Sequence, residues 1–286
     1  MDNTIHRERN FVVRNANLNE MPFLLTLATE EGWNPGLHDA GAFFATDPKG
    51  FFIGELDGIK VGCISSVAYS DTYGFMGFFI IKPEYRHSGL GLEMTKTVMA
   101  SVGNRIIGLN AESREAKNYQ KSGFIPFYKT LRFQGSVVNA AEPSPVEKIS
   151  NIPFEQLLGY DTAIFGVSRE NFLKKWIAMT NSYGYAIVEK GALCGYGVIR
   201  SCVQGYRIGP LFADTPQIAF QLLQELVFKI GNAPFYIDIP EINVQAIAMA
   251  KKMELIVVSE TIRMYTSTPP LQTSDKIYGV TTQELG

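Results

Sequence analysis

Short apolar runs and amphipathic stretches follow one another along the whole chain, which predicts strands and helices in a mixed order. The clearest apolar run, Phe78 to Ile81, predicts a buried strand, and Lys82-Pro83 ends it because proline lacks the amide that a sheet ladder needs. From Leu90 onward apolar side chains recur every four residues, and this spacing places them on one helical face. The stretch therefore predicts a strand, a turn and a helix in succession.

The elements around this stretch are predicted from turn residues and from helix ends. Asp57-Gly58 between two apolar runs is a strong signal for a hairpin. After the helix, a strand-like run leads into a helical pattern that ends at Gly123, a residue suited to the C′ position. The predicted strands are 11–14, 51–55, 59–67, 73–81, 105–109 and 127–133, and the predicted helices are 17–27, 39–45, 90–102 and 112–122.

The second half of the chain repeats this order of elements. Ser168 is suited to cap a first helix, and Asp214 and Thr215 to cap a helix that Pro216 opens. The predicted strands are 183–189, 194–202, 206–212, 235–239 and 256–265, and the predicted helices are 168–181, 216–230 and 244–253. We therefore expect an α/β fold of the α+β kind, with a mixed sheet, made of two related halves in tandem.

A stretch with little apolar periodicity separates the two halves. Asn139 to Pro153 contains three prolines, which predicts a linker. The domains expected from this are 1–137 and 154–286, joined by a linker at 138–153. A length of 286 residues with 46% hydrophobic residues is enough for two domains of ordinary size.

The turn between the strand and the helix is rich in glycine. It reads Arg86-His87-Ser88-Gly89-Leu90-Gly91, where two glycines allow consecutive backbone N–H groups to point inward. Such a turn at a helix N-terminus binds phosphate. Because no Gly-Lys-Ser/Thr follows and the G-x-G-x-x-G triplet is incomplete, nucleotide hydrolysis and nicotinamide chemistry are disfavoured.

This turn resembles motif A of the GNAT acyltransferases, written R/Q-x-x-G-x-G/A, and Tyr119 to Phe124 resembles their motif B, Y-x-K-x-G-F. The whole chain is similar to bacterial GNAT proteins with a C-terminal YitH-like acetyltransferase domain. The segments that carry this second resemblance are 195–197, 208–211, 263–265 and 281–286. The resemblance implies a tandem of two GNAT-like domains and acetyl-coenzyme A (acetyl-CoA) as co-substrate.

The resemblance also implies which residues contact the coenzyme. The amides from His87 to Leu92 would bind its pyrophosphate, and Phe79 to Ile81 would pair through their backbone with its pantetheine arm. The amide of Ile81 would polarise the thioester carbonyl, and Tyr119 would donate a proton to the departing thiolate. Core packing is the alternative for Phe79 to Ile81 and for Tyr119. The predicted coenzyme contacts are Phe79, Ile80, Ile81, Arg86, His87, Ser88, Gly89, Leu90, Gly91, Leu92 and Tyr119.

The acceptor needs a base, because an amine with a pKa of ~10 is mostly protonated at neutral pH. Glu112, just after a predicted strand, is the first candidate and Glu55 the second; either could instead be a surface or ion-paired carboxylate. Trp33, Asn34 and Asp39 lie in the loop region that borders the acceptor site in GNAT folds, so we predict that they bind the substrate. The alternatives are that Trp33 fills the core and that Asp39 caps a helix.

The second half has no glycine turn at the corresponding place. Asp214 lies where a pyrophosphate would need bare amides, so this half is not expected to bind coenzyme A conventionally. We expect it to form a wall of the acceptor pocket or a dimer-like mate of the first half. Arg207, Asp238 and Arg263, with Tyr206, are polar residues in apolar strands, and burial requires them to pair with one another or to face a cleft.

Charge and composition argue against several kinds of binding partner for this chain. A net charge of −2 gives no reason to expect nucleic acid, and no apolar run approaches the ~20 residues that span a membrane. The polar start MDNTIHRERN is unlike a signal peptide, so a cytoplasmic location is expected. The thiols of Cys63, Cys194 and Cys202 are expected to be buried and unpaired. The histidines do not cluster with cysteines, so no metal site is predicted.

The favoured function is an acetyl-CoA-dependent N-acetyltransferase that acts on a small-molecule amine by direct attack in a ternary complex. One alternative is a protein lysine or N-terminal acetyltransferase. Another is a non-enzymatic coenzyme A sensor whose second half signals to a partner, and the weakest is a purely structural tandem. We expect a monomer or a homodimer.

Overall fold

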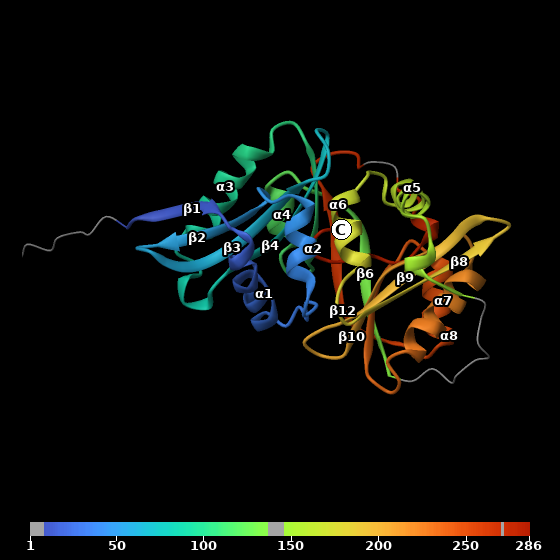
Figure 1. The fold of residues 1–286 in the computed structure, drawn as a ribbon. Coiled ribbons are helices and arrows are strands. Elements are labelled where there is room, and N and C mark those ends of the chain that lie inside the picture. The colour runs from blue at the N-terminus through green and yellow to red at the C-terminus, as the bar shows by residue number, and fades with distance from the viewer. Residues whose placement is uncertain (1–8, 137–145, 270–271) are drawn as a thin grey trace, which may run out of the picture.

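The computed structural model describes residues 9–136, 146–269 and 272–286, which form a mixed α/β structure on a single 13-stranded sheet (Figure 1). The strands are β1 Phe11–Asn15, β2 Phe51–Leu56, β3 Ile59–Ala68, β4 Tyr73–Ile81, β5 Ile106–Glu112, β6 Ile125–Gly135, β7 Glu147–Lys148, β8 Ser182–Glu189, β9 Ala192–Ser201, β10 Tyr206–Ala213, β11 Phe235–Pro240, β12 Ile256–Tyr265 and β13 Ile277–Gly279. The α-helices are α1 Met21–Glu30, α2 Asp39–Thr46, α3 Leu90–Val102, α4 Ala116–Lys121, α5 Phe154–Phe165, α6 Glu170–Ile177, α7 Pro216–Phe228 and α8 Val244–Lys252. The predicted fold class and the repeated order of elements are confirmed.

The two halves exchange their last strands at the middle of the sheet. The order is β1-β2-β3-β4-β5-β12-β6-β11-β10-β9-β8-β7, with β13 beside β10. Thus β12 lies between β5 and β6, where Arg263 is opposite Asn110 on one side and Tyr128 on the other. In turn, β6 pairs with β11 of the second half. The sheet of each half is therefore completed by a strand of the other.

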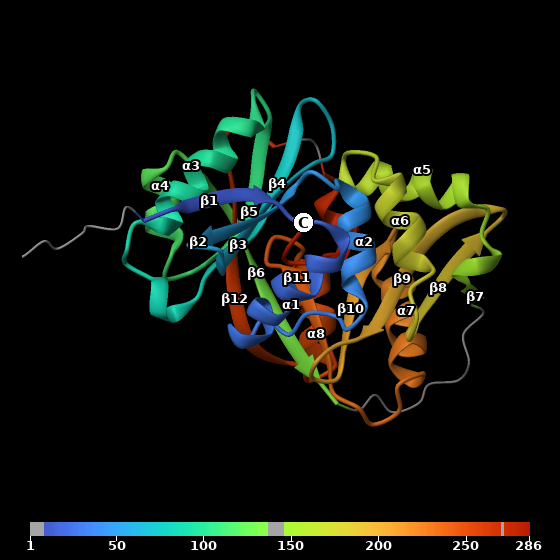
Figure 2. The ribbon, with the colours of Figure 1, turned by 60° about the vertical axis from the view of Figure 1, so that its left-hand side comes forward.

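One hydrophobic core is formed by both halves, and each of the other two lies mainly in one half, with residues from the strand that the other half contributes. The shared core contains α1, α2, α5 and α6, and in it the rings of Phe43 and Trp176 stack with centroids 6.1 Å apart. Helix α2 lies next to α6 in both views (Figures 1 and 2). Helices α3 and α4 cover the other face of the first half, and α7 and α8 the other face of the second. The first half therefore has two distinct faces, one packed between the halves and one bearing α3.

The region between the halves differs from its prediction. Residues 137–145 of the expected linker lie outside the described residues, whereas residues 146–153 include β7 and a 3-10 turn whose Ile149 is buried. Helix α5 was not predicted, because a charged residue, Asp161, interrupts its buried face and Gly159 weakens the helical pattern. The helix expected at 168–181 is α6, and its N-cap is Arg169 rather than Ser168, since Arg169 pairs with Asp161 of α5 at 2.7 Å.

Candidate active site

Strands β4 and β5 separate at the centre of the first half. They pair in parallel from Tyr73 to Met76 of β4, and β5 then continues beside β12 alone. On its other side β4 has a bulge, because Ile64 of β3 faces both Phe78 and Phe79, and Phe78 has a φ of 49°. The thiol of Cys63 donates to the Phe78 carbonyl at 3.1 Å. The edge of β4 from residue 77 to 81 therefore turns away from β5 and has no strand partner on that side.

The thiols are buried as predicted for Cys63 and Cys202, whereas Cys194 is half-buried.

The glycine turn, residues 86–91, follows this unpaired edge. His87 and Gly89 have left-handed φ values of 60° and 88°, and α3 begins at Leu90 as predicted. The Ser88 hydroxyl donates to the Tyr85 carbonyl at 2.5 Å. Among the described residues, no protein acceptor is found for any amide from 87 to 92. Unpartnered amides at the N-terminus of a 13-residue helix are suited to bind an anion.

Two contacts fix the position of the turn. A Cβ at Gly91 would lie 3.1 Å from the ring of Phe79, so the turn packs directly on β4. Arg86 donates from Nε to the Ile81 carbonyl at 2.8 Å, and its Nη2 pairs with Glu31 at the end of α1. Arg86 thus ties the turn to β4 and α1. This geometry gives no support to its predicted contact with the pyrophosphate.

Tyr119 lies on the face of the sheet that bears α3. Its ring packs edge-on against Phe124 at 5.8 Å, in the same core as Ile81 and Phe79. Burial, with smaller contributions from Glu115 and Glu112, raises the pKa of Tyr119 to about 12. The hydroxyl is therefore protonated at neutral pH and can act as a proton donor.

Trp33 and Glu112, both predicted as site residues, meet on the opposite face. The indole Nε1 donates to Glu112 Oε1 at 3.2 Å, and Glu112 Oε2 pairs with Arg114 at 2.7 Å. Glu112 ends β5 beside the point where β4 has turned away, and its side chain is 36% exposed, so water reaches it. Glu55 is less suited to act as the base, because its hydrogen bond from Arg14 lowers its pKa and β3 separates its strand from β4.

Asn34 and Asp39 connect the first half to the second. Asn34 exchanges hydrogen bonds of 2.8 and 2.9 Å with the backbone of Gln204. Asp39 is fully buried, pairs with Arg200 at 2.8 Å and accepts from the Gly36 amide at 2.9 Å. With both carboxylate oxygens engaged, Asp39 serves neither as a helix cap nor, in this geometry, as an acceptor contact.

Several polar residues on the same face were not predicted as site residues. Asn110 and Tyr128 flank Arg263 in register, and Asn110 Nδ2 donates to the Gln283 carbonyl at 2.8 Å. Residues 280–286, here called the C-terminal segment, lie between the two halves (Figure 1). The segment is buried against β4, because a Cβ at Gly77 would lie 2.2 Å from the carbonyl oxygen of Glu284. The sequence signals for this region were a polar residue, Arg263, in an apolar strand and the resemblance of 263–265 and 281–286 to the YitH-like domain.

The pairing expected among the polar strand residues is confirmed for two of them. Arg207 and Asp238 form an ion pair of 2.7 Å, to which Arg132 adds a second bond to Asp238 at 2.8 Å. Arg207 also contacts Glu284 at 3.4 Å. Burial alone would raise the pKa of Asp238, but Arg132 and Arg207 outweigh it and keep this pKa well below its usual range.

The second half has a corresponding separation of strands, which the chain itself fills. Strand β10 pairs with β11 only as far as Ile208, and β13 then pairs with β10 opposite Leu211 and Phe212. Thr215 caps α7 by accepting from the Ile218 amide, and Asp214 pairs with Lys276 at 2.9 Å. An extended coenzyme arm would have to displace β13 to bind there.

The described residues contain no group of three or more His, Cys, Asp or Glu side chains placed to hold a metal ion. Across the same residues no helix is long and apolar enough to cross a membrane.

Comparison with protein families assigns both halves. Two profiles of the acetyltransferase (GNAT) domain match the chain, one over residues 47–126 and the other over residues 157–279. The chain belongs to the GNAT acyltransferases. The matched ranges include the β4 bulge, the glycine turn and Tyr119 in the first half, so this GNAT protein is an acyltransferase of tandem construction, and acetyl-CoA is the co-substrate of its family.

Relatives extend over nearly the whole of this GNAT chain. A holothin acyltransferase of Pseudoalteromonas sp. (strain SANK 73390) is 29% identical over 95% of this chain and 93% of its own length. The uncharacterised N-acetyltransferase YitH of Bacillus subtilis (strain 168) is 25% identical over 76% of this chain and 78% of its own. These relatives and the two domain matches agree in supporting acetyltransferase activity.

Solved structures share the fold. A Pyrococcus horikoshii protein assigned as an acetyltransferase superposes with a TM-score of 0.84 at 22% identity, covering 100% of this chain and 99% of that one. A tandem GNAT protein from the clavulanic acid biosynthesis pathway gives 0.65 at 10% identity, covering 91% of this chain and 100% of that one. At such identities the likeness concerns the architecture of two GNAT halves in tandem.

Proposed function

We propose that the protein transfers the acetyl group of acetyl-CoA to a primary amine of a small molecule, with both substrates bound together. The observation that carries this proposal is the set of amides from 87 to 92, which have no partner within the part of the chain that the structure describes and follow directly on the unpaired edge of β4. The diphosphate binds at these amides, and the pantetheine arm lies along Phe79 to Ile81. The thioester then lies where β4 and β5 separate.

The residues of the chain supply three functions at the reacting atoms. An amide at the end of the unpaired edge of β4 farthest from the glycine turn donates to the thioester carbonyl as negative charge develops on it. The Ile81 amide, nearer the turn, pairs with the pantetheine arm. Tyr119, on the face that bears α3, protonates the departing thiolate, and its pKa of about 12 keeps it protonated until then. Glu112, held by Trp33 on the other face, removes the proton from the attacking amine directly or through water.

The residues that cover the sheet face opposite α3 support a small acceptor. Trp33 lies over Glu112, and the C-terminal segment packs on Gly77, which leaves little access for a folded protein or an extended tail. A relative named as an acyltransferase of holothin, rather than of a protein, points in the same direction. The second half, proposed as residues 154–286 after a first domain at 1–137, acts as a wall of the acceptor site and does not bind coenzyme A.

The experiment is to measure free-thiol release from acetyl-CoA with a library of small amines and with lysine-containing peptides. Thiol release in wells with small amines supports the proposal, and release with peptides alone contradicts it in favour of a protein acetyltransferase. A thermal shift with coenzyme A but no thiol release with any acceptor would indicate a coenzyme sensor.

The position of the coenzyme is tested with a matched pair of variants on one helix. Gly91→Val adds a branched side chain where a Cβ already lies 3.1 Å from Phe79, and it should raise the KM for acetyl-CoA severalfold. Ala100→Val introduces the same side chain at an exposed position of α3 and should leave this KM unchanged. Equal KM values for the two variants would contradict the assigned diphosphate site.

A further inference from the structure

Among the described residues, Arg263 differs from the other buried arginines in forming no ion pair with a carboxylate. Its side chain is 1% exposed, Nε donates to Asn110 Oδ1 at 2.8 Å and Nη1 lies 3.5 Å from the Tyr265 hydroxyl. No carboxylate of the described residues forms an ion pair with it within 4.0 Å. In contrast, Arg169, Arg200 and Arg207 pair with Asp161, Asp39 and Asp238 at 2.7, 2.8 and 2.7 Å. A buried cation without a counter-charge is unfavourable unless an anion joins it.

The aromatic residues around Arg263 do not supply that charge. Its guanidinium lies 4.8 Å from the ring centre of Phe75 and 5.9 Å from that of Tyr128. Burial raises the pKa of Tyr128 to about 12 and that of Tyr73 well above its usual value, so both phenols are neutral at physiological pH. Ring faces attract a cation but leave its full charge uncompensated.

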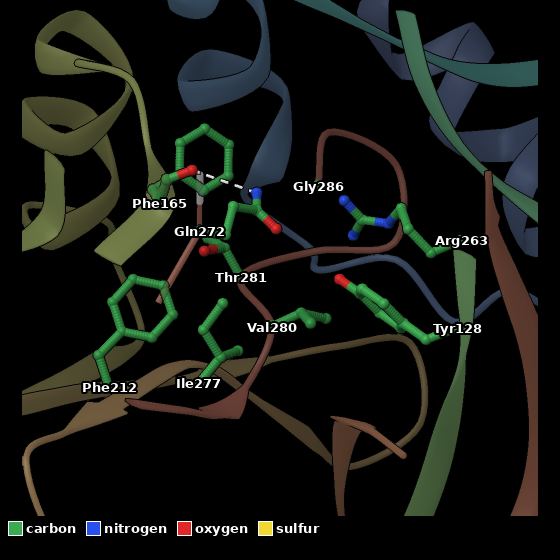
Figure 3. A pocket seen from close by; sticks show the side chains of 9 residues that line it. All are labelled: Tyr128, Phe165, Phe212, Arg263, Gln272, Ile277, Val280, Thr281 and Gly286. Carbon is green, nitrogen blue, oxygen red and sulfur yellow. Dashed lines mark hydrogen bonds between the residues drawn. The ribbon is translucent and has the colours of Figure 1, made fainter. Parts of the chain in front are cut away.

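Arg263 lines a cavity between the halves, here called the Arg263 cavity (Figure 3). Its lining residues are Tyr128, Phe165, Phe212, Arg263, Gln272, Ile277, Val280, Thr281 and Gly286. The Thr281 hydroxyl is buried and has no hydrogen-bond partner within the described parts of the chain. An orphan hydroxyl and an uncompensated guanidinium in one cavity are the donors that a carboxylate requires.

The cavity lies close to the proposed position of the thioester. The Arg263 guanidinium is over Phe75, two residues before Gly77, and a strand rises ~3.3 Å per residue. Asn110, which accepts from Arg263, is the first residue of β5 beyond its last pair with β4. An anion at Arg263 is therefore about the length of a small amino acid from the separation of the strands.

We propose that the Arg263 cavity binds a carboxylate of the acceptor, so that the substrates are small amines with a carboxylate a few bonds away. This inference rests on the proposed function, since it names the substrate class of that site. Arg263 and Thr281 bind the carboxylate, while the amine extends past Asn110 toward the thioester. Because the cavity has room for only about one water-sized group in this conformation, the C-terminal segment moves outward as the acceptor enters.

The first test compares acceptors of equal carbon number, 4-aminobutyrate against butylamine and β-alanine against propylamine, in the thiol-release assay. The carboxylate should lower KM ~10- to 100-fold, as one charged hydrogen-bonded pair would, with little effect on kcat because it is remote from the reacting atoms. Equal KM values within each pair of acceptors would overturn the inference.

Two variants assign this preference to the cavity. In Arg263→Gln the two acceptors of each pair should have equal KM values. The control is Arg105→Gln, which should keep the preference for the carboxylate; Arg105 donates to the Ser70 carbonyl at 2.8 Å. Thr281→Val removes a hydroxyl with no protein partner, so it should fold like the parent and raise the KM for 4-aminobutyrate severalfold but not that for butylamine. If Arg263→Gln fails to fold, the KM values of Thr281→Val show whether the preference depends on the cavity. The control for this variant is Thr29→Val, on the exposed side of α1.

A binding measurement separates this inference from the proposed function. Butyrate, which cannot be acetylated on nitrogen, should raise Tm in the parent and not in Thr281→Val. Thiol release with butylamine but no butyrate shift would overturn the carboxylate site and leave the acetyltransferase standing. A butyrate shift with no thiol release from any amine would support the site and contradict the proposed function.

Discussion

Gly77 of β4 packs against the carbonyl oxygen of Glu284, so closely that a Cβ at position 77 would lie 2.2 Å from it. The contact joins the bulged strand of the first half to the C-terminal segment. It also shows why glycine is needed at a position with no turn, since the approaching atoms belong to backbone and cannot rotate away. The proposed acceptor side of the site is thus built from residues 77 and 280–286 together.

Gly77→Ala should displace the C-terminal segment. We expect a loss of about 1–3 kcal/mol in the free energy of unfolding, because overpacking against backbone cannot be relieved by a rotamer change. Urea unfolding would measure this loss, and acceptor KM should rise in parallel. The control is Gly41→Ala in α2, where a Cβ would have no neighbour within 4 Å and should be neutral or slightly stabilising. Equal stabilities of the two variants would contradict this account of Gly77.

Tyr119→Phe should lower kcat about tenfold or more and leave the KM for acetyl-CoA unchanged, because only the proton donor is lost while the ring keeps its contact with Phe124. A pKa of about 12 means that the phenol does not lose its proton between pH 7 and 10, so kcat should show no fall from this group across that range. Steady-state kinetics at several pH values measure both effects. Tyr183→Phe, at an exposed residue of β8, is the control, and full turnover by Tyr119→Phe would remove Tyr119 from the mechanism.

Arg86 and Glu31 offer a test of what the arginine in the glycine turn does. If Arg86 acts by tying the turn to α1, then Arg86→Ala and Glu31→Gln should each raise the KM for acetyl-CoA a few-fold, and the double variant should be no worse than Arg86→Ala. Kinetics of the three variants measure this coupling. A large effect of Arg86→Ala with none from Glu31→Gln would instead indicate direct contact with the pyrophosphate.

Asp238 should make stability depend on acidic pH. Its pKa is depressed, so it contributes stability above the pKa of an unfolded aspartate, ~3.9, and this contribution is lost as the pH falls below that value. Asp238→Asn leaves Arg132 and Arg207 short of a counter-charge and should cost about 3–5 kcal/mol at pH 7. Urea unfolding between pH 3 and 7 measures both. The control is Asp71→Asn, at a fully exposed residue, which should unfold with the same free energy as the parent. If Asp238→Asn also unfolded with the free energy of the parent, the ion-pair account would be contradicted.

Local signals predicted where several helices begin. The helix start at Leu90 depends on a left-handed Gly89 next to it, and the start of α7 depends on Thr215 and Pro216, so a few neighbouring residues determine each. The acceptor side depends on residues far apart in sequence. Asp39 and Arg200 are 161 positions apart, and no periodicity links two such residues. For the same reason the sequence predicted that Asp39 is a loop residue near the acceptor and gave no indication of its buried ion pair.

The insertion of β12 between β5 and β6 had no signal in the sequence at all. The bounds of β12 were predicted correctly, whereas β5 was expected to end at residue 109 and β6 to span 127–133, both shorter than observed. An apolar pattern predicts that a strand is buried but does not identify the strands beside it. Arg263 illustrates the limit. It was recognised as a polar residue in an apolar strand, whereas its position over Phe75 follows only from the pairing of β12 with β5.

The exchange of β6 and β12 also limits how such a chain can evolve. A duplicated domain that has lost its own coenzyme turn would ordinarily be free to drift or to be deleted, since its neighbour could work without it. In this chain, deletion of the second half would remove β12 and leave one edge of β5 in the first half without a strand partner. If the first half alone carries the chemistry, as proposed, the second half is still retained as part of its scaffold, and selection on catalysis extends to residues that never touch a substrate.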